Sequence, residues 1–202
     1  MRWDIIVIGN LSRNCYWGEA DDRAVRPALC TCTLIRSESV RLLVDPSLGD
    51  PRRMAAELDR RTGLELGDID AVFITHEHGD HWAGLANFRS ADWFAAGPVA
   101  EALIATGRLE KAVRPAEGNL LGLAEIVPTP GHTFSHHSLR FDCEGRSIVV
   151  AGDAAMTREF WRDRRGFHNS VDFDQATRSM EALASKADIV VPGHDNWFLA
   201  SA

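Results

Sequence analysis

A polar segment, THEHGDH at positions 75–81, follows directly after the apolar run IDAVFI at 69–74. The run has the length and composition of a buried strand, so the polar segment begins where that strand leaves its sheet. The spacing H-x-H-x-D-H places four metal-binding side chains on one short loop: His76, His78, Asp80 and His81. Imidazole nitrogen and carboxylate oxygen suit zinc, iron or manganese. The segment therefore predicts a metal site at the edge of a sheet.

One loop cannot surround an ion, so a metal site needs ligands from elsewhere in the chain. Three further candidates each follow a strand-like apolar run: His132 in TPGHT, Asp153 in VVAGDAA and His194 in VVPGHD. A loop residue at the end of a buried strand is held rigidly at a sheet edge. A histidine beside an apolar strand is, when it stands alone, more often a hydrogen-bonded core or surface residue. The joint pattern favours a shared metal site instead.

Elements of strand and helix length recur in a similar order in the two halves of the chain. The first half predicts strands at 3–9, 28–36, 39–45 and 69–74, and helices at 51–63, 81–88 and 97–106. The second half predicts strands at 123–130, 137–142, 147–153 and 188–193, and a helix with an acidic cap at 172–187. This order predicts an α/β fold in which two sheets face each other with helices outside, as one domain over residues 1–202.

Composition restricts the partners of such a protein. The 202 residues are 45% hydrophobic, enough for one substantial core, and the net charge of −7 argues against nucleic acid. No apolar run reaches the length of about 18 residues that a membrane span needs, and the start of the chain lacks the pattern of a signal peptide. A cytoplasmic protein is therefore expected. Cys30 and Cys32 are expected to pack in the core rather than bind metal.

The order of the motifs resembles the metallo-β-lactamase-fold hydrolases. H-x-H-x-D-H, G-H-T, G-D and P-G-H follow one another here, and with LLVD at 42–45 the resemblance covers nearly the whole chain. It implies an αββα sandwich with two divalent metal ions between mostly antiparallel or mixed sheets. The implied ligands are His76, His78 and His132 for one metal, Asp80, His81 and His194 for the second, and Asp153 as the bridge. Asp45 would support the loop without binding metal, and His136 would orient a ligand.

The resemblance also implies a reaction. Two divalent ions lower the pKa of a shared water toward about 7, so a metal-bridging hydroxide would be the nucleophile of a hydrolysis. Zinc is the expected metal, with iron or manganese as alternatives. Asp80 would additionally orient the hydroxide or pass a proton to the leaving group. His168, in GFHNSVD, is a candidate substrate-facing catalytic group, with an ordinary loop histidine as its alternative.

The substrate stays open, because lactonases, thioesterases, β-lactamases, nucleases and some iron dioxygenases share this ligand set. The first hypothesis is a hydrolase of small-molecule esters, thioesters or lactones. The segment GDAAMTREFWRD is similar to that of acyl-homoserine lactone lactonases, which commonly carry a tyrosine where this chain has Met156. The compact chain and its VVPGH ending also resemble the small metallo-β-lactamase domain-containing protein 1 group. A phosphodiesterase or nuclease and a mononuclear iron sulfur dioxygenase are the alternatives, and a homodimer is left open.

Overall fold

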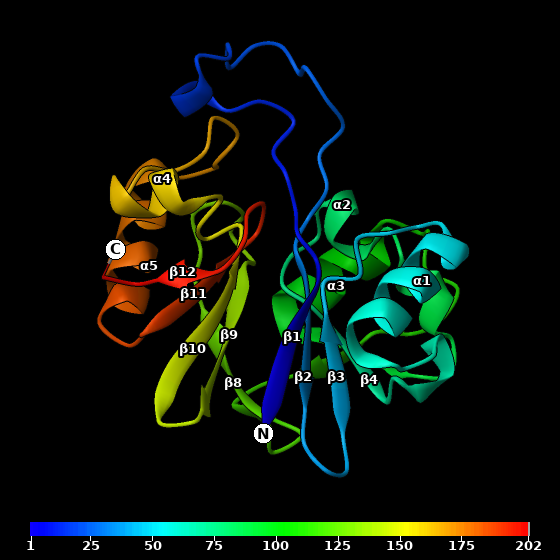
Figure 1. Ribbon diagram of the computed structural model, residues 1–202. Helices are drawn as coiled ribbons and strands as arrows, with labels where there is room; N and C mark the ends of the chain where they lie inside the picture. Colours follow the sequence, from blue (N-terminus) through cyan, green and yellow to red (C-terminus); the bar gives the residue numbers. More distant parts are fainter. Residues whose placement is uncertain (202) are drawn as a thin grey trace.

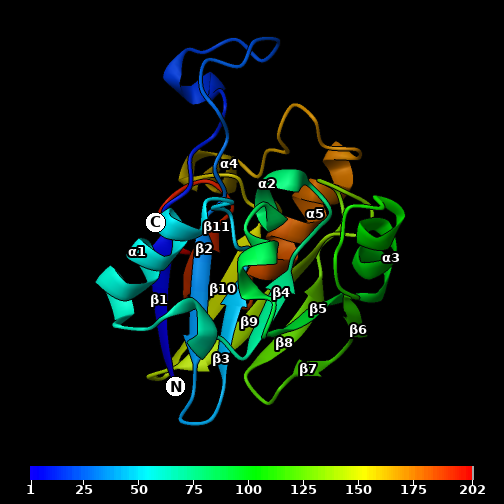
Figure 2. The same ribbon diagram turned by 90° about the vertical axis from the view of Figure 1, so that its right-hand side faces the viewer.

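Two six-stranded β-sheets pack face to face in the computed structural model, which describes residues 1–201 (Figure 1). The first sheet has the order β1-β2-β3-β4-β5-β6 and is visible as neighbouring strands in Figure 2. Strands β1 to β3 pair antiparallel, and β3 to β6 pair parallel. The strands are β1 (Arg2–Val7), β2 (Cys32–Arg36), β3 (Arg41–Val44), β4 (Ala71–Ile74), β5 (Asp92–Ala96) and β6 (Arg114–Ala116).

The second sheet has the order β12-β11-β10-β9-β8-β7. Only the pair β10 and β11 is parallel; the other neighbours are antiparallel. Its strands are β7 (Asn119–Leu120), β8 (Ala124–Pro128), β9 (His137–Cys143), β10 (Arg146–Gly152), β11 (Ile189–Pro192) and β12 (Phe198–Leu199). Because β10 and β11 run in the same direction, the residues that follow them emerge at the same edge of the sheet.

Helices cover the outer faces of both sheets, which confirms the predicted αββα sandwich (Figure 1). The first sheet carries α1 (Pro51–Thr62), α2 (Gly79–Trp82) and α3 (Gly97–Ala105), and the second carries α4 (Arg158–Arg162) and α5 (Phe173–Ala184). Helix α1 begins as its sequence indicates, because the Asp50 carboxylate accepts a hydrogen bond from the Arg52 amide, and it ends at Gly63 with φ of 71°. Across residues 1–201, no helix combines the length and apolarity needed to cross a membrane.

A continuous apolar core holds the two sheets together. Phe73 of β4, Trp93 of β5 and Leu139 of β9 belong to it and are almost completely buried. Burying one such side chain stabilises the fold by roughly 1.5–3 kcal/mol. Cys30 and Cys32 are also fully buried, as expected. Since side chains from both sheets interlock in this core, the sheet edges that carry the polar loops are held in a fixed relation.

Two predicted elements differ from the structure. The predicted helix 81–88 is divided into α2 and a 3₁₀ turn, Leu85–Phe88. At Gly84 between them, the amide donates to the Pro46 carbonyl, and a Cβ would lie 2.4 Å from the Leu48 carbonyl oxygen. The predicted strand 28–36 begins only at Cys32, because the neighbouring Thr31 amide donates to Gly193 of the other half. Helix α4 and the strands β5, β6, β7 and β12 were not predicted.

An arm, residues 10–30, connects β1 to β2 and extends beyond the sheets (Figure 1, the blue loop at the top). Its tip is fastened to helix α4. The Tyr16 hydroxyl donates to Asp163 Oδ2 at 2.7 Å, and its ring packs edge-on against Phe160 with the ring centroids 5.0 Å apart. An ion pair between Arg26 and Glu19 closes the arm on itself. The arm is thus an ordered extension of the fold.

The pKa of Tyr16 tests this attachment. Burial, and then the hydrogen bond and charge of Asp163, raise the pKa of Tyr16 to about 12. Tyr16 is the single tyrosine of the chain, so ultraviolet absorbance of the phenolate reports it alone. We expect a midpoint near 12 in the wild type and a lower one in Asp163→Asn. A wild-type midpoint near the ordinary value of about 10 would contradict the attachment.

The same shift links the arm to stability. The pKa of Tyr16 is higher in the folded than in the unfolded chain, so its contribution to the free energy of unfolding is complete below about pH 10. That contribution is lost as the pH rises through about 12. Tyr16→Phe should abolish this part of the alkaline decline, measured by urea unfolding across that range.

Candidate metal centre

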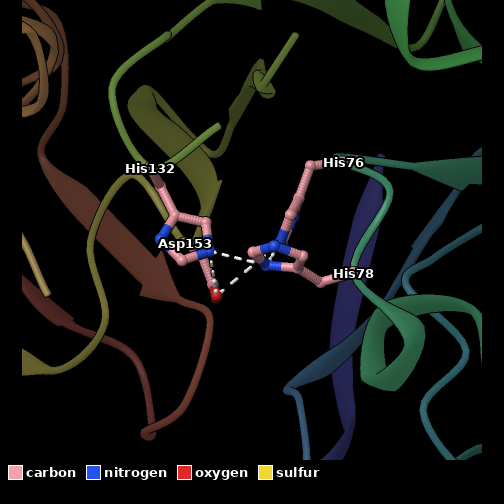
Figure 3. A group of neighbouring side chains, drawn as sticks. All are labelled: His76, His78, His132 and Asp153. Atoms are coloured by element: carbon pink, nitrogen blue, oxygen red, sulfur yellow. Dashed lines mark hydrogen bonds and ion pairs between the residues drawn. The ribbon is translucent and has the colours of Figure 1, made fainter. Parts of the chain in front are cut away.

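The seven residues predicted from the motifs meet at one end of the sandwich, between the two sheets. The loop of His76 to His81 follows β4 of the first sheet. His132, Asp153 and His194 follow β8, β10 and β11 of the second sheet. Figure 3 shows side chains from the two sides pointing toward one another. The structure thus brings together residues separated by up to 118 positions, from His76 to His194.

The first group contains three imidazoles and one carboxylate, whose potential ligand atoms all lie within 4.8 Å of one another: His76, His78, His132 and Asp153. His78 Nδ1 lies 3.1 Å from His76 Nε2 and 2.8 Å from His132 Nε2 (Figure 3). Asp153 Oδ2 lies 3.1 Å from His132 Nε2 and 3.7 Å from His76 Nε2. These four atoms converge on one small volume, as ligands of a single cation do.

The second group contains Asp80, His81 and His194, again within 4.8 Å. His194 Nε2 lies 3.6 Å from Asp80 Oδ2. The other oxygen of Asp153, Oδ1, lies 3.1 Å from His81 Nε2 and 3.2 Å from His194 Nε2. Asp153 therefore directs one carboxylate oxygen at each group.

The buried polar atoms of this site fit cations. His81 Nε2 and Asp153 Oδ1 are buried 3.1 Å apart, yet neither has a hydrogen bond of good geometry to any residue among 1–201. An unsatisfied buried polar atom costs roughly 1–3 kcal/mol, so a set of them requires an explanation. A divalent cation would accept their lone pairs, and this mixture of imidazole and carboxylate suits zinc, iron or manganese.

The electrostatics of the cluster favour the metal-binding forms of His76 and Asp153 and protonate His81. Burial, followed by the charge of His81, lowers the pKa of His76 well below its ordinary value, so this imidazole is neutral. Burial opposes ionisation of Asp153, but His81 and His194 nevertheless hold its pKa well below the ordinary range. Burial also opposes the charge on His81, but the carboxylates of Asp153 and Asp45 raise its pKa well above its ordinary value. A cation bound here would displace the proton of His81.

The outer nitrogens of the histidines are held by fixed acceptors. Asp45 Oδ2 accepts from His81 Nδ1 at 2.9 Å and from Thr75 Oγ1 at 2.7 Å, and Oδ1 accepts from the Thr75 amide at 2.8 Å. His194 Nδ1 donates to the Leu29 carbonyl at 2.9 Å. Such contacts orient the opposite nitrogen, Nε2, toward the centre. Asp45 thus supports the loop, as the resemblance implied.

His136 and His137 take opposite directions, as alternation along a strand requires. His136 is fully buried, and its Nδ1 lies 2.8 Å from Thr129 Oγ1. Its ring packs 4.9 Å from that of His76, which places it beside the cluster without joining either group. His137 is half-buried and lines a separate cavity of about 510 Å³ that contains none of the seven motif residues.

Two glycines of the motifs are required by close approach. A Cβ at Gly193 would lie 2.0 Å from Asp153 Oδ1. Gly152 has φ of +52°, and a Cβ there would lie 2.8 Å from Thr75 Oγ1. Any side chain at these two positions would displace the carboxylate or the loop that carries the histidines. The G-D and P-G-H motifs therefore follow from packing as well as from ligand chemistry.

Cys30 lies beside the second group without the character of a ligand. Its sulfur belongs to a third group of close atoms with Asp45 and His81. Burial raises the pKa of the Cys30 thiol to about 12. The thiol donates to the carbonyls of Thr31 and Asp45, at 3.4 and 3.6 Å. Cys30 is thus a protonated buried donor that packs against the centre.

A cavity of about 460 Å³ opens over the two groups. His78, Asp80, Asp153 and His194 line it together with His168, which the sequence had singled out as a candidate. Gly79, inside the H-x-H-x-D-H loop, also lines it. The sequence did not indicate the other lining residues in this role: Leu11, Ser12, Arg13, Ala28, Met156, Phe167 and Asn169. The arm residues among them carry no spacing signal, because only the fold brings the arm to the site.

A model of the metallo-β-lactamase superfamily matches residues 25–194, which include every residue of the centre. The chain belongs to the metallo-β-lactamase superfamily. Its sequence is similar to those of three curated proteins described next. The matched parts span 60%, 37% and 63% of the lengths of these proteins, in that order. The first is an N-acyl homoserine lactonase of Bacillus sp, 26% identical over 67% of this chain. The second is a hydroxyacylglutathione hydrolase of Rhodopseudomonas palustris, 34% identical over 48% of this chain. The third is metallo-beta-lactamase domain-containing protein 1 of Rattus norvegicus, 30% identical over 78% of this chain.

Solved structures of the superfamily confirm the fold. A Thermotoga maritima structure named for the metallo-β-lactamases superposes with a TM-score of 0.75 at 19% identity, over 98% of both chains. AidC, described as a dizinc quorum-quenching lactonase with a bound product, superposes with a TM-score of 0.69 at 17% identity, over 83% of this chain and 72% of its own. At these identities the likeness establishes the superfamily's architecture for this chain.

Removing the Asp45 carboxylate should destabilise the protein strongly. Asp45→Ala leaves the Thr75 amide, the Thr75 hydroxyl and His81 Nδ1 without their acceptor in a buried site. We expect the free energy of unfolding to fall by about 3 kcal/mol or more, because each buried donor left unpaired costs roughly 1–3 kcal/mol. Urea denaturation measures this loss. Asp45→Asn, which keeps one acceptor oxygen, should lose less, and equal stability of all three proteins would contradict the assigned role.

Proposed function

We propose that the protein is a dinuclear metal-dependent hydrolase of small-molecule esters, thioesters or lactones. One observation carries the proposal: the buried Asp153 directs Oδ1 at one group of potential ligands and Oδ2 at the other. A carboxylate in this position is able to bridge two cations. The first cation would also be bound by His76, His78 and His132, and the second by Asp80, His81 and His194.

The chemistry follows from this arrangement. When bound, two zinc ions would polarise a carbonyl oxygen and make water acidic enough to serve as a nucleophile near neutral pH. Asp80 lines the cavity, so its carboxylate is placed to orient a water molecule or to accept its proton. Asp45 and the Leu29 carbonyl keep His81 and His194 in the orientation that exposes Nε2. The protein groups thus hold the imidazoles in position, and Asp80 provides a carboxylate for proton transfer.

Three further observations support a small substrate. The cavity volume of about 460 Å³ lies in the range of small-molecule sites. The net charge of −7 opposes binding of a nucleic acid. The relatives include an N-acyl homoserine lactonase and hydroxyacylglutathione hydrolases, whose names denote small-molecule substrates. Because both sheets share one core, we also treat residues 1–202 as one catalytic domain.

Metal content and a substrate panel test the proposal together. After loading with zinc, the wild type should hold two cations per chain and hydrolyse model thioesters or lactones. Asp153→Ala should lose both cations and more than about a hundredfold in kcat/KM, because metal sites depend this strongly on correctly placed groups. The exposed carboxylate of Asp174 provides the matched control, and Asp174→Ala should keep both properties.

Three other results would contradict the proposal. Cleavage of phosphodiesters with inert thioesters and lactones would assign a phosphodiesterase. A single bound iron with thiol-dependent oxygen uptake would assign a dioxygenase. Full activity of Asp153→Ala would remove the bridging role itself.

We further propose that His168 contacts the substrate. Its side chain lines the cavity, and burial followed by the charge of Arg13 lowers the pKa of His168, which leaves the imidazole neutral at pH 7. His168→Ala should lower kcat/KM about tenfold, the loss expected for one hydrogen bond to substrate, with cation content unchanged. An unchanged rate would return His168 to an ordinary loop residue.

A further inference from the structure

One basic side chain lies in the wall of the cavity above the metal centre. Arg13, from the arm, lines the cavity with His168 and Asn169. Among the described residues of that lining, Arg13 is the single lysine or arginine. The positive charge available to a ligand's remote end is therefore concentrated at this one guanidinium.

The guanidinium of Arg13 is largely unpaired. Its Nη1 donates to the backbone carbonyl of Asp21 at 2.5 Å, and its Nε is buried without a hydrogen-bond partner anywhere in residues 1–201. The nearby carboxylates are engaged by other arginines: Glu19 pairs with Arg26, and Asp21 lies 3.9 Å from Arg165. No ion pair to a carboxylate of the described chain neutralises Arg13. A guanidinium held in this way has donors and charge available for an anion.

Arg26 shows what a structural arginine on the same arm looks like. Its Nη1 donates to the Leu11 carbonyl at 3.1 Å and to Glu19 Oε2 at 3.0 Å, and its Nη2 pairs with the other Glu19 oxygen. These bonds satisfy both its charge and its donors within the arm. Arg13 makes one such bond, to the Asp21 carbonyl, so a role in the arm accounts for only part of its donors and for none of its charge.

Residues on both sides of Arg13 hold it in place. Leu11 packs in a buried apolar cluster with Met156 and Phe167. The Ser12 carbonyl accepts from the Val25 amide at 2.9 Å, which closes the base of the arm. On the other side, Asn14 Oδ1 accepts from the Tyr16 amide at 3.0 Å. The backbone on both sides of Arg13 is thus already ordered before a ligand binds, which favours affinity.

The cavity presents three chemical zones to a ligand. The candidate metal ligands would engage the bond to be cleaved, and Leu11, Met156 and Phe167 provide an apolar wall. Arg13 and Asn169 provide polar donors. We propose that Arg13 binds a carboxylate at the end of the acyl chain remote from the cleaved bond, so that the substrate is an ester or thioester of a dicarboxylic acid. This inference rests on the proposed hydrolase function.

The choice of a carboxylate follows from charge and shape. One guanidinium balances the single charge of a carboxylate, and its planar donors match the two oxygens. A phosphate monoester carries nearly two charges, and this wall offers it one cation. The apolar wall suits the methylene groups that separate the two carbonyl carbons of a dicarboxylic acid.

Paired substrates test the inference. The glutaryl and pentanoyl thioesters of N-acetylcysteamine have the same chain length and differ in the terminal carboxylate. The zinc-loaded wild type should prefer the glutaryl thioester by about tenfold or more in kcat/KM, the value of a hydrogen bond to a charged group. In Arg13→Gln this preference should fall to about twofold or less, and in Arg13→Lys it should be partly restored. A ratio cancels any loss common to both substrates, including a loss from imperfect folding or metal loading.

Arg23→Gln is the matched control. Arg23 is an exposed arginine on the same arm that does not line the cavity, so this variant should keep the wild-type preference. An equal loss of preference in Arg23→Gln would show a general effect of arm charge and overturn the assignment to Arg13. A wild type without preference would overturn the inference while leaving the hydrolase proposal intact.

A binding measurement separates this inference from the proposed reaction. Calorimetry with glutarate and pentanoate on the zinc-loaded protein should show tighter binding of glutarate in the wild type and equal binding in Arg13→Gln. This result would support the role of Arg13 in recognition even if neither thioester were hydrolysed. Inert thioesters would count only against the proposed reaction. Equal wild-type affinities, or tighter binding of glycerol phosphate than of glutarate, would overturn it.

Discussion

The site depends on one buried carboxylate. Asp153 is removed from water between the two sheets, and imidazoles from both groups surround its oxygens. A charge in such surroundings is tolerated only with close partners of opposite sign. The neighbouring histidines can provide that charge as protons, and a pair of cations would provide it more strongly. The loops, the glycines and the outer acceptors described above all serve to bring partners to these two oxygens.

The distribution of the candidate ligands between the sheets has a structural consequence. The first sheet contributes the loop after β4, and the second contributes the residues after β8, β10 and β11. Neither sheet alone carries a complete group around Asp153. The centre therefore depends on the apolar core that fixes the sheets in relation to each other, and it tolerates little sliding between them.

Prediction from sequence succeeded where the functional residues form a recognisable spacing pattern along the chain. The H-x-H-x-D-H loop and the single ligands after apolar strands identified the cluster, and the two rounds of strands and helices identified the sandwich. It failed where structure depends on distant contacts. Gly84 interrupts a predicted helix because the Pro46 and Leu48 carbonyls lie against it, and Arg13 reaches the cavity because the arm folds back over it. Neither relation leaves a periodic signal in the chain.

Within residues 1–201, the hydrogen bonds between the arm and the candidate ligand His194 are made by main-chain carbonyls, those of Asn10 and Leu29. Every amino acid supplies a carbonyl, so residues along the arm are able to change without altering the orientation of that imidazole. Under the proposed function, the arm would set the choice of substrate, and the loops after the strands would hold the cations. Substitutions between β1 and β2 could then change the ligand that the cavity accepts while the candidate metal centre stays unaltered.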